Sequence, residues 1–200
     1  VIATDSYRLA RKQIDLPEKY ENDFNLVIPG KNLLELSRIL EDDKENVYMH
    51  IFNNKVLFKY KNIIFLSRLI SGTYPVTSNI IPKEFKIDIE CDYSSLFDMI
   101  DRASLLTSDK DKNTIKLDLR NRELTISSNS PEIGKVEEKI AIDNADEISI
   151  SFSSKYMLEA IKSFNSEKIH LLMNNDNSPI IVKSDKELSL IQLVLPIKTY

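Results

Sequence analysis

A stretch of strand, turn and amphipathic helix occurs twice in this chain, and this repetition constrains the fold more than any short motif. The first copy is Leu26–Arg38, LVIPGKNLLELSR, and the second is Ile148–Lys162, ISISFSSKYMLEAIK. A shift of 124 positions matches Lys31 to Lys155, Leu34 to Leu158, Arg38 to Lys162, Val47 to Leu171, Met49 to Met173 and Leu69 to Leu193. A register that holds from the helix through the following strands without a gap predicts two copies of one structural unit.

Each copy carries two cations seven residues apart, Lys31 with Arg38 and Lys155 with Lys162. Seven residues are about two helical turns, so each pair lies on one helical face. Apolar residues occupy mainly the other side: Leu33, Leu34, Ile39 and Leu40 in the first helix, and Met157, Leu158 and Ile161 in the second. Two interpretations stay open, a solvated helix face and a repeated contact with a polyanion, and the repetition favours the second.

The charge balance excludes a protein that is coated in basic residues. Lys plus Arg number 27 and Asp plus Glu 31, which gives a formal net charge of -4 over 200 residues. A local basic surface remains compatible with this total, because electrostatic steering depends on where the charges lie. The single cysteine, Cys91, permits no internal disulfide and is typical of a reducing compartment. With no signal-peptide pattern and no long apolar run, the sequence predicts a soluble cytoplasmic protein without membrane contact.

Hydrophobic periodicity and turn signals predict strands throughout the chain, the repeated helix of each copy and one further helix before the second copy. Strands are expected at Val1–Thr4, Tyr7–Ile14, Phe24–Ile28, Val47–Phe52, Lys55–Tyr60 and Ile63–Leu69 around a helix at Lys31–Leu40, with a loop at Asp15–Asn22. Further strands are expected at Phe85–Glu90, Thr114–Leu119, Glu123–Ser128, Lys135–Ile142, Ile169–Met173, Ile180–Lys183 and Leu188–Leu195, and a second helix at Tyr93–Leu106 capped by Asp92. Helices on one side of antiparallel sheets make an α+β fold.

The domain boundaries follow from the duplication and from one proline-bracketed segment. GTYPVTSNIIP separates the two copies, which predicts a first domain at residues 1–74, a linker at 75–82 and a second domain at 83–200. Residue 1 corresponds to about residue 125, and Phe85–Leu124 has no counterpart in the first copy. We therefore expect the chain to be a fragment whose first domain lacks its opening strand–helix–strand.

Enzymatic chemistry finds little support in the sequence. His50 and His170 lie in predicted strands without metal-ligand spacing, so no metal site and no cofactor are expected. Cys91 precedes a helix, where a thiol is activated in some enzymes, but no histidine is near it in sequence. Asp5 and Arg8 are compatible with a carboxylate site, although a turn-stabilising pair is the stronger interpretation.

Three segments, taken in order, resemble bacterial DNA polymerase III beta subunits, the sliding clamps. ATDSYRLA at Ala3–Ala10 looks like the signature strand–turn–strand of that family, GTYPVTSNIIP resembles its interdomain linker, and LVLPIKTY at Leu193–Tyr200 resembles its C-terminal tail. The resemblance covers the chain from end to end. It implies the DNA clamp fold, with residues 1–74 as the end of the second clamp domain and 83–200 as the whole third domain.

The resemblance implies a non-catalytic processivity factor of DNA replication. Family members form a ring of two head-to-tail subunits around duplex DNA, and helices line the central hole. Lys31, Arg38, Lys155 and Lys162 would then face the DNA and contact phosphates without reading bases. Leu105 and Leu106 resemble the apolar contact on the third-domain side of the subunit interface, which packs against a first domain.

The family also docks short linear motifs of polymerase and clamp-loader subunits and of repair proteins in a pocket between the second and third domains. The matching positions are Thr4, Ser6, Tyr7, Arg8 and Leu9 of the signature, Pro75, Asn79 and Ile80 of the linker, Ser153 and Tyr156 of the last helix, and Leu193, Leu195, Pro196 and Ile197 of the tail. Many members have glycine where Ser6 stands and a basic residue where Asn79 stands. For Leu9, Leu193 and Leu195 an ordinary core role stays open.

A second function class stays open beside the clamp. The net negative charge is compatible with an intracellular adaptor that binds peptides and does not contact nucleic acid, whereas the repeated basic pairs count against it. Peptide binding that is weakened by Leu9→Ala or Leu195→Ala would support the pocket in either class. Weak binding of linear duplex DNA by this fragment is expected if DNA is held by encirclement.

Overall fold

The computed structural model describes residues 1–16, 23–77 and 79–198, and the chain divides into two compact units. The larger unit combines Val1–Asp15 with Ser78–Tyr200, and the smaller unit is Leu16–Thr77. Most of the predicted loop at Asp15–Asn22 lies outside the described residues. The first fifteen residues therefore fold with the C-terminal part of the chain rather than with the residues that follow them.

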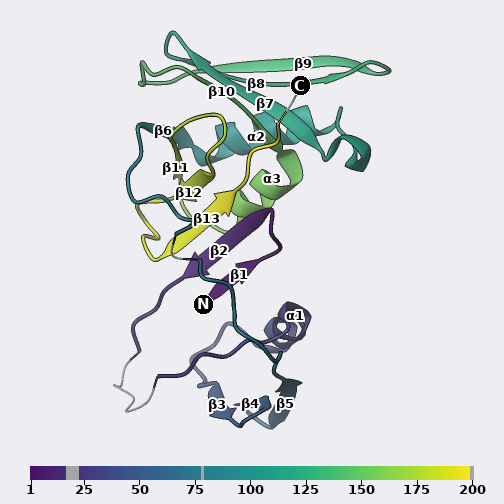
Figure 1. Ribbon diagram of the computed structural model, residues 1–200, viewed down its shortest axis with the longest axis vertical. Helices are drawn as coiled ribbons and strands as arrows, with labels where there is room; N and C mark the ends of the chain where they lie inside the picture. Colours follow the sequence, from purple (N-terminus) through teal and green to yellow (C-terminus); the bar gives the residue numbers. More distant parts are fainter. Residues whose placement is uncertain (17–22, 78, 199–200) are drawn as a thin grey trace. The chain divides into compact units, whose positions relative to one another are not determined.

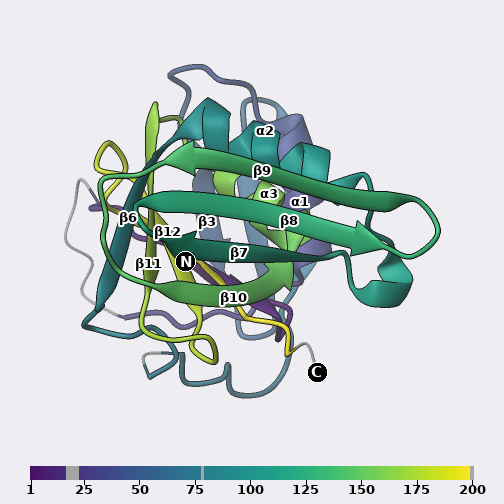
Figure 2. The same ribbon diagram turned by 90° about the horizontal axis from the view of Figure 1, so that it is seen from above.

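Two antiparallel sheets and two helices make up the larger unit (Figure 1). Its elements are β1 (Ile2–Thr4), β2 (Arg8–Lys12), β6 (Ile87–Asp92), α2 (Tyr93–Ser104), the short 3-10 helix η1 (Asp109–Asp111), β7 (Thr114–Arg120), β8 (Glu123–Ser130), β9 (Gly134–Ala141), β10 (Ile148–Ser153), α3 (Ser154–Lys162), β11 (Lys168–Met173), β12 (Ile180–Lys183) and β13 (Leu190–Val194). The six-stranded sheet has the order β1-β2-β13-β12-β11-β6, and the four-stranded sheet has the order β10-β7-β8-β9. In Figure 2 the four-stranded sheet lies across α2 and α3.

Both helices begin at polar side chains that cap them. The Asp92 carboxylate accepts a hydrogen bond from the Ser95 N–H at 2.9 Å, which confirms the predicted cap of α2. The Ser153 hydroxyl accepts one from the Tyr156 N–H at 3.5 Å at the start of α3. Such caps satisfy backbone N–H groups that have no partner inside the helix. They fix where each helix leaves the strand before it.

One hydrophobic core joins both helices to both sheets in the larger unit. Its fully buried side chains include Leu96 and Ile100 of α2, Leu117 of β7, Phe152 of β10 and Ile161 of α3. A second, smaller cluster contains Leu9, Leu172, Ile181, Ile191 and Leu193, all from strands of the six-stranded sheet. Leu172 of β11 packs in this second cluster, whereas its neighbours Leu171 and Met173 pack in the main core. Successive side chains of a strand point to opposite faces of the sheet, so β11 is buried on both faces.

The smaller unit contains α1 (Gly30–Ile39) and a three-stranded sheet in the order β3-β4-β5, with β3 at Tyr48–Ile51, β4 at Lys55–Tyr60 and β5 at Ile63–Arg68. Its core consists of buried Leu36, Val56 and Phe58 with partly buried neighbours. The predicted strand Phe24–Ile28 is wrong, since these residues form no strand. The Ile70 N–H donates a hydrogen bond to the Val27 carbonyl oxygen at 2.8 Å, but this bond is not part of a strand pairing.

The element order within each unit agrees with the internal duplication. In the smaller unit α1 is followed by β3, β4 and β5, and in the larger unit α3 is followed by β11, β12 and β13, each triplet pairing in sequence order. The helices occupy equivalent positions, since α1 begins at Gly30 and α3 at Ser154. The α+β class with antiparallel sheets is confirmed. The boundaries 1–74, 75–82 and 83–200 stay a proposal.

Candidate functional site

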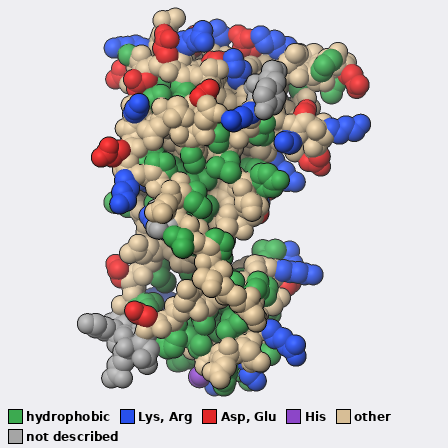
Figure 3. All heavy atoms as spheres, viewed as in Figure 1, with side chains coloured by type: hydrophobic (Ala, Val, Ile, Leu, Met, Phe, Trp, Pro, Cys, Tyr) green, Lys and Arg blue, Asp and Glu red, His purple; other side chains and the backbone are tan. Residues whose placement is uncertain are grey.

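A pocket of about 370 Å³ opens on the larger unit where β2, β13 and α3 meet. Its lining comes from three distant parts of the sequence: Ala3, Thr4, Asp5, Arg8, Leu9 and Ala10; Tyr156, Glu159 and Ala160; and Gln192 and Leu193. Figure 3 shows hydrophobic side chains gathering towards this part of the larger unit, while charged side chains crowd its four-stranded sheet. The pocket therefore combines an apolar floor with a polar rim, as small-molecule and peptide sites do.

Strand β2 forms the floor because it pairs directly with β13, with Leu9 opposite Leu193. Both leucines are only 2% exposed and belong to the second hydrophobic cluster. Both leucines are therefore core residues, which is the alternative that the sequence left open, and both also line the pocket. Leu195 is half-buried, and its N–H donates to the Tyr7 carbonyl oxygen at 3.0 Å, which ties the tail to the signature turn.

The turn between β1 and β2 is organised by Asp5. Its carboxylate accepts hydrogen bonds from the N–H groups of Tyr7 at 3.0 Å and Arg8 at 3.1 Å, and from Arg8 Nε at 2.9 Å. Burial acts to raise the pKa of Asp5, but these donors outweigh it, so the pKa of this carboxyl lies below its ordinary value. The Thr4 hydroxyl donates to the Arg8 carbonyl oxygen at 2.7 Å. The pair Asp5–Arg8 is thus turn-stabilising, as the sequence indicated.

Arg8 connects this turn to α3. Its guanidinium forms a close ion pair with Glu159 and lies over the Tyr156 ring, 4.6 Å from the ring centroid. The Tyr7 ring stacks on Tyr156 with centroids 6.3 Å apart. A planar guanidinium suits both contacts, because it stacks on rings while donating in its own plane. Arg8 and Tyr156 therefore form one wall of the pocket, and Tyr7 stacks on Tyr156 from outside the lining.

Ser6 adopts a left-handed backbone conformation, with φ at 76°. A side chain in this region costs about 1–2 kcal/mol that glycine avoids, partly offset by the greater freedom of glycine in the unfolded chain. We expect Ser6→Gly to raise the free energy of unfolding by up to about 1 kcal/mol in chemical denaturation. Ser6→Ala keeps the β-carbon and serves as the control, and an equal gain from Ser6→Ala would contradict backbone strain.

The remaining predicted pocket residues lie near the site or in the linker. Ser153 caps α3 and is buried, and Pro196 and Ile197 follow β13, where the Ile197 N–H donates to the Ser151 carbonyl oxygen at 2.7 Å. Pro75, Asn79 and Ile80 are exposed, and none of these three described residues is among the lining residues. Pro75 belongs to the smaller unit, and Asn79 and Ile80 belong to the larger unit.

The four predicted DNA-facing cations are exposed on their helices. In α1, Arg38 donates to Glu35 at 2.7 Å, so part of its charge is neutralised locally. In α3, Lys162 lies over the Phe97 ring of α2 at 5.2 Å from the centroid. The neighbouring α2 exposes Asp98 and Asp101, which reduces the positive potential beside α3.

Cys91 and the two histidines, the residues considered for enzymatic chemistry, lie on separate strands. Cys91 lies in β6, is 2% exposed, and burial raises its pKa to about 12, which opposes thiolate formation. His50 is exposed on β3 of the smaller unit, and His170 lies in β11 of the larger unit.

Leu105, predicted for the subunit interface, is 74% exposed just after α2, and Leu106 is half-buried. Within the described residues, no helix is long and apolar enough to cross a membrane.

Sequence reasoning missed six of the lining residues: Ala3, Asp5, Ala10, Glu159, Ala160 and Gln192. Glu159 follows its ion-pair partner Arg8 by 151 positions, and an exposed glutamate on an amphipathic helix carries no local signal of that contact. Gln192 is half-buried between buried neighbours in β13, and its side chain donates to the Ser163 hydroxyl at 2.8 Å. The pairing of β2 with β13, which sets Gln192 opposite Ala10, would have indicated Gln192.

Comparisons with known proteins agree with this arrangement. Residues 1–76 match the family model described as DNA polymerase III beta subunit, central domain, and residues 78–198 match the one described as its C-terminal domain. The beta sliding clamp of Bacillus subtilis is 43% identical over 203 residues, and that of Staphylococcus aureus is 39% identical over 200, each alignment covering 99% of this chain and 53% of the relative.

A crystal structure of the Bacillus subtilis sliding clamp superposes with a TM-score of 0.93 at 42% identity, covering all of this chain and 53% of that one. The chain thus spans about half the length of the curated relatives that it matches. The two family models together match nearly every residue of this chain in order, and the solved relative superposes on this chain over its full length. This chain belongs to the DNA polymerase III beta subunit family.

Proposed function

We propose that the protein containing this sequence is a processivity factor of DNA replication, a ring that encircles duplex DNA and slides along it. The observation that carries the proposal is the ordered match to both the central and the C-terminal domain models, joined to relatives named beta sliding clamp. We infer that the subunit is non-catalytic and acts by holding other proteins on DNA. Its homodimeric ring would close through Leu105 and Leu106, with Leu105 exposed for that contact.

In this proposal, Lys31 and Arg38 of α1 and Lys155 and Lys162 of α3 face the DNA. All four are exposed and lie at equivalent positions of the duplicated unit. Flexible lysines beside acidic Asp98 and Asp101 suit weak contacts to phosphates through water, which carry no base information and leave a ring free to slide. Encirclement, and not local affinity, would then keep the protein on DNA.

We expect the 200-residue chain to bind linear duplex DNA weakly, without sequence preference, and less strongly as salt rises. Changing Lys31, Arg38, Lys155 and Lys162 to alanine together should lower the slope of log affinity against log salt by about 0.9 for each phosphate that the variant no longer neutralises. Fluorescence anisotropy with labelled duplex over a salt series measures both quantities.

A matched control removes the same charge from exposed lysines that lie outside the α-helices: Lys44, Lys59, Lys110 and Lys186. Its salt slope should stay close to that of the parent chain. An equal fall in the control, or tight binding that salt does not weaken, would contradict a role for the helical cations. An unchanged salt slope and affinity in the helix variant would remove the helical cations as the DNA contact. No duplex binding by the parent chain at all would favour the peptide-binding adaptor without DNA contact.

The pocket at β2, β13 and α3 is proposed to hold short linear motifs of polymerase and clamp-loader subunits and of repair proteins. Its apolar floor at Leu9 and Leu193 suits leucine or phenylalanine side chains, and the polar rim at Thr4, Arg8 and Gln192 suits the amide of glutamine. We keep the linker residues Pro75, Asn79 and Ile80 in this proposal as further contacts of the bound peptide, although they do not line the pocket.

A further inference from the structure

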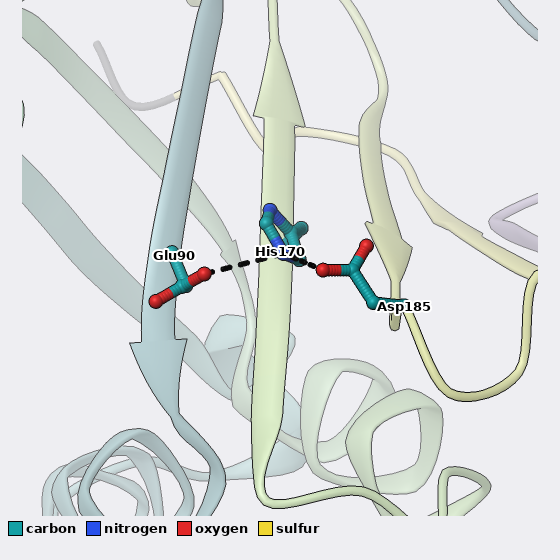
Figure 4. Close-up of side chains that lie close together, drawn as sticks. All are labelled: Glu90, His170 and Asp185. Atoms are coloured by element: carbon teal, nitrogen blue, oxygen red, sulfur yellow. Dashed lines mark ion pairs between the residues drawn. The ribbon is translucent and has the colours of Figure 1, made fainter.

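His170 lies at the centre of a group of acidic side chains on the six-stranded sheet, away from the peptide pocket. It is a residue of β11, directly opposite Glu90 of β6 in the antiparallel register, and Asp185 follows the adjacent strand β12. Figure 4 shows the two carboxylates on either side of the imidazole. The ligand atoms of these three residues lie within 4.8 Å of one another.

The two nitrogens of His170 have different surroundings. Nδ1 lies 2.9 Å from Asp88 Oδ1, so a neutral ring places its proton there and leaves a lone pair on Nε2. Nε2 has less than 1 Å² of accessible surface and no hydrogen-bond partner, although the whole side chain is 17% exposed. It faces two further acceptors, Asp185 Oδ2 at 3.4 Å and Glu90 Oε2 at 3.7 Å. A lone pair that faces two carboxylates is repelled unless a proton or a metal cation lies between them.

The two distances from His170 Nε2 to the carboxylates match the coordination sphere of a small divalent metal. Ligands about 2.0–2.2 Å from a tetrahedral metal lie roughly 3.3–3.6 Å from each other, close to the two distances at Nε2. Asp88 at Nδ1 supplies the carboxylate–histidine contact that orients metal-bound imidazoles. Lys168 binds Glu90 through Oε1, so Oε2 remains directed at the histidine. A pocket of about 440 Å³ is lined by His170, Glu90 and Asp88, and Asp185 lies outside its lining.

We propose that His170, Glu90 and Asp185 form a binding site for a divalent transition-metal ion such as Zn²⁺, with Asp88 as the positioning residue for the imidazole. One neutral imidazole and two carboxylates give the set a charge that a divalent ion neutralises, and imidazole with carboxylates is a ligand set that zinc accepts. Removing the imidazole leaves two carboxylates without the nitrogen that holds the ion in place. The site shares no residue with the peptide pocket, so it is independent of the proposed function.

A proton on Nε2 is the competing occupant. Burial lowers the pKa of His170, whereas Asp88, Asp185 and Glu90 raise it, and the net effect places it above the ordinary value. An imidazolium would donate towards both carboxylates and would leave no ligand for a metal. Metal titration separates the two occupants, because only the metal site gives saturable binding with proton release.

The experiment is isothermal titration of the 200-residue chain, freed of metal with a chelator, against Zn²⁺ near pH 7.5. We expect one site per chain, release of protons, and a rise in the melting temperature that a chelator reverses. His170→Gln should abolish this binding, and Glu90→Gln and Asp185→Asn should each weaken it at least tenfold. Asp88→Asn should weaken it about 10- to 100-fold, as loss of an orienting partner does.

His50→Gln is the matched control, because it removes the other histidine from an exposed strand of the smaller unit. It should keep one-to-one binding. Absence of saturable binding in the parent chain, or equal binding after His170→Gln, would overturn the proposal. Melting temperatures of all variants without metal show whether each is folded, and the milder Glu90→Gln and Asp185→Asn changes decide the question if His170→Gln unfolds the chain.

Discussion

Replacing Tyr156 by alanine is expected to weaken the binding of a peptide with spaced glutamine and leucine or phenylalanine residues by about 10- to 100-fold. Tyr156 forms the pocket wall, stacks on Tyr7 and lies under the Arg8 guanidinium. Truncating an aromatic anchor at the centre of an interface costs about 1.5–3 kcal/mol, and each 1.4 kcal/mol is about tenfold in affinity. Fluorescence polarisation with a labelled peptide measures the change directly.

Tyr93→Ala provides a closely matched control for this variant. Tyr93 is also a half-buried tyrosine in the first turns of a helix, and it stacks on Phe97 with centroids 6.0 Å apart, but it lies outside the pocket lining. Its loss should leave peptide affinity within about twofold. Equal weakening by both variants would remove the pocket assignment and point to a general loss of structure. Leu9→Ala is a less specific test, because Leu9 is a buried core residue whose truncation also destabilises the fold.

Replacing Leu96 by alanine is expected to lower the free energy of unfolding by about 2–5 kcal/mol. Leu96 is completely buried in α2, in the core that joins both sheets of the larger unit. Alanine is the best helix former, so the loss would come from the cavity and not from helix propensity. Urea denaturation followed by circular dichroism measures it.

Leu188→Ala is the control, because Leu188 belongs to the same unit and is 77% exposed. Its effect should stay within about 0.5 kcal/mol. A small loss for Leu96→Ala, comparable with that control, would contradict the central place of α2 in the core. The two variants therefore test the packing of the larger unit without touching any proposed binding residue.

The sequence predicted those elements whose signals are local. The capped helix after Asp92, the helix after Ser153 and the alternating strands of the hairpins follow from spacing within one segment, and the structure confirms them. Phe24–Ile28 has the composition of a strand but finds no ladder, because strand formation depends on a partner that composition does not reveal. Local periodicity therefore predicts whether a segment can form a helix or a strand, but it does not predict which strands pair.

The pocket was predictable only in part for the same reason. The resemblance named Thr4, Arg8, Leu9, Tyr156 and Leu193, and the structure brings these five together in one lining. It did not give Glu159, whose contact with Arg8 depends on how β2 lies against α3. That placement follows from the register of β2 with β13, a long-range pairing that no local pattern encodes.

This pairing has a practical consequence for anyone dividing the protein into pieces. The family boundary falls near residue 77, yet β1 and β2 lie before it and complete the sheet that ends in β13 after it. A truncated product starting at residue 78 would leave β13 paired with β12 only, and it would uncover Leu193, which invites self-association through a bare sheet edge. The family module and the compact structural unit are therefore different stretches of this polypeptide.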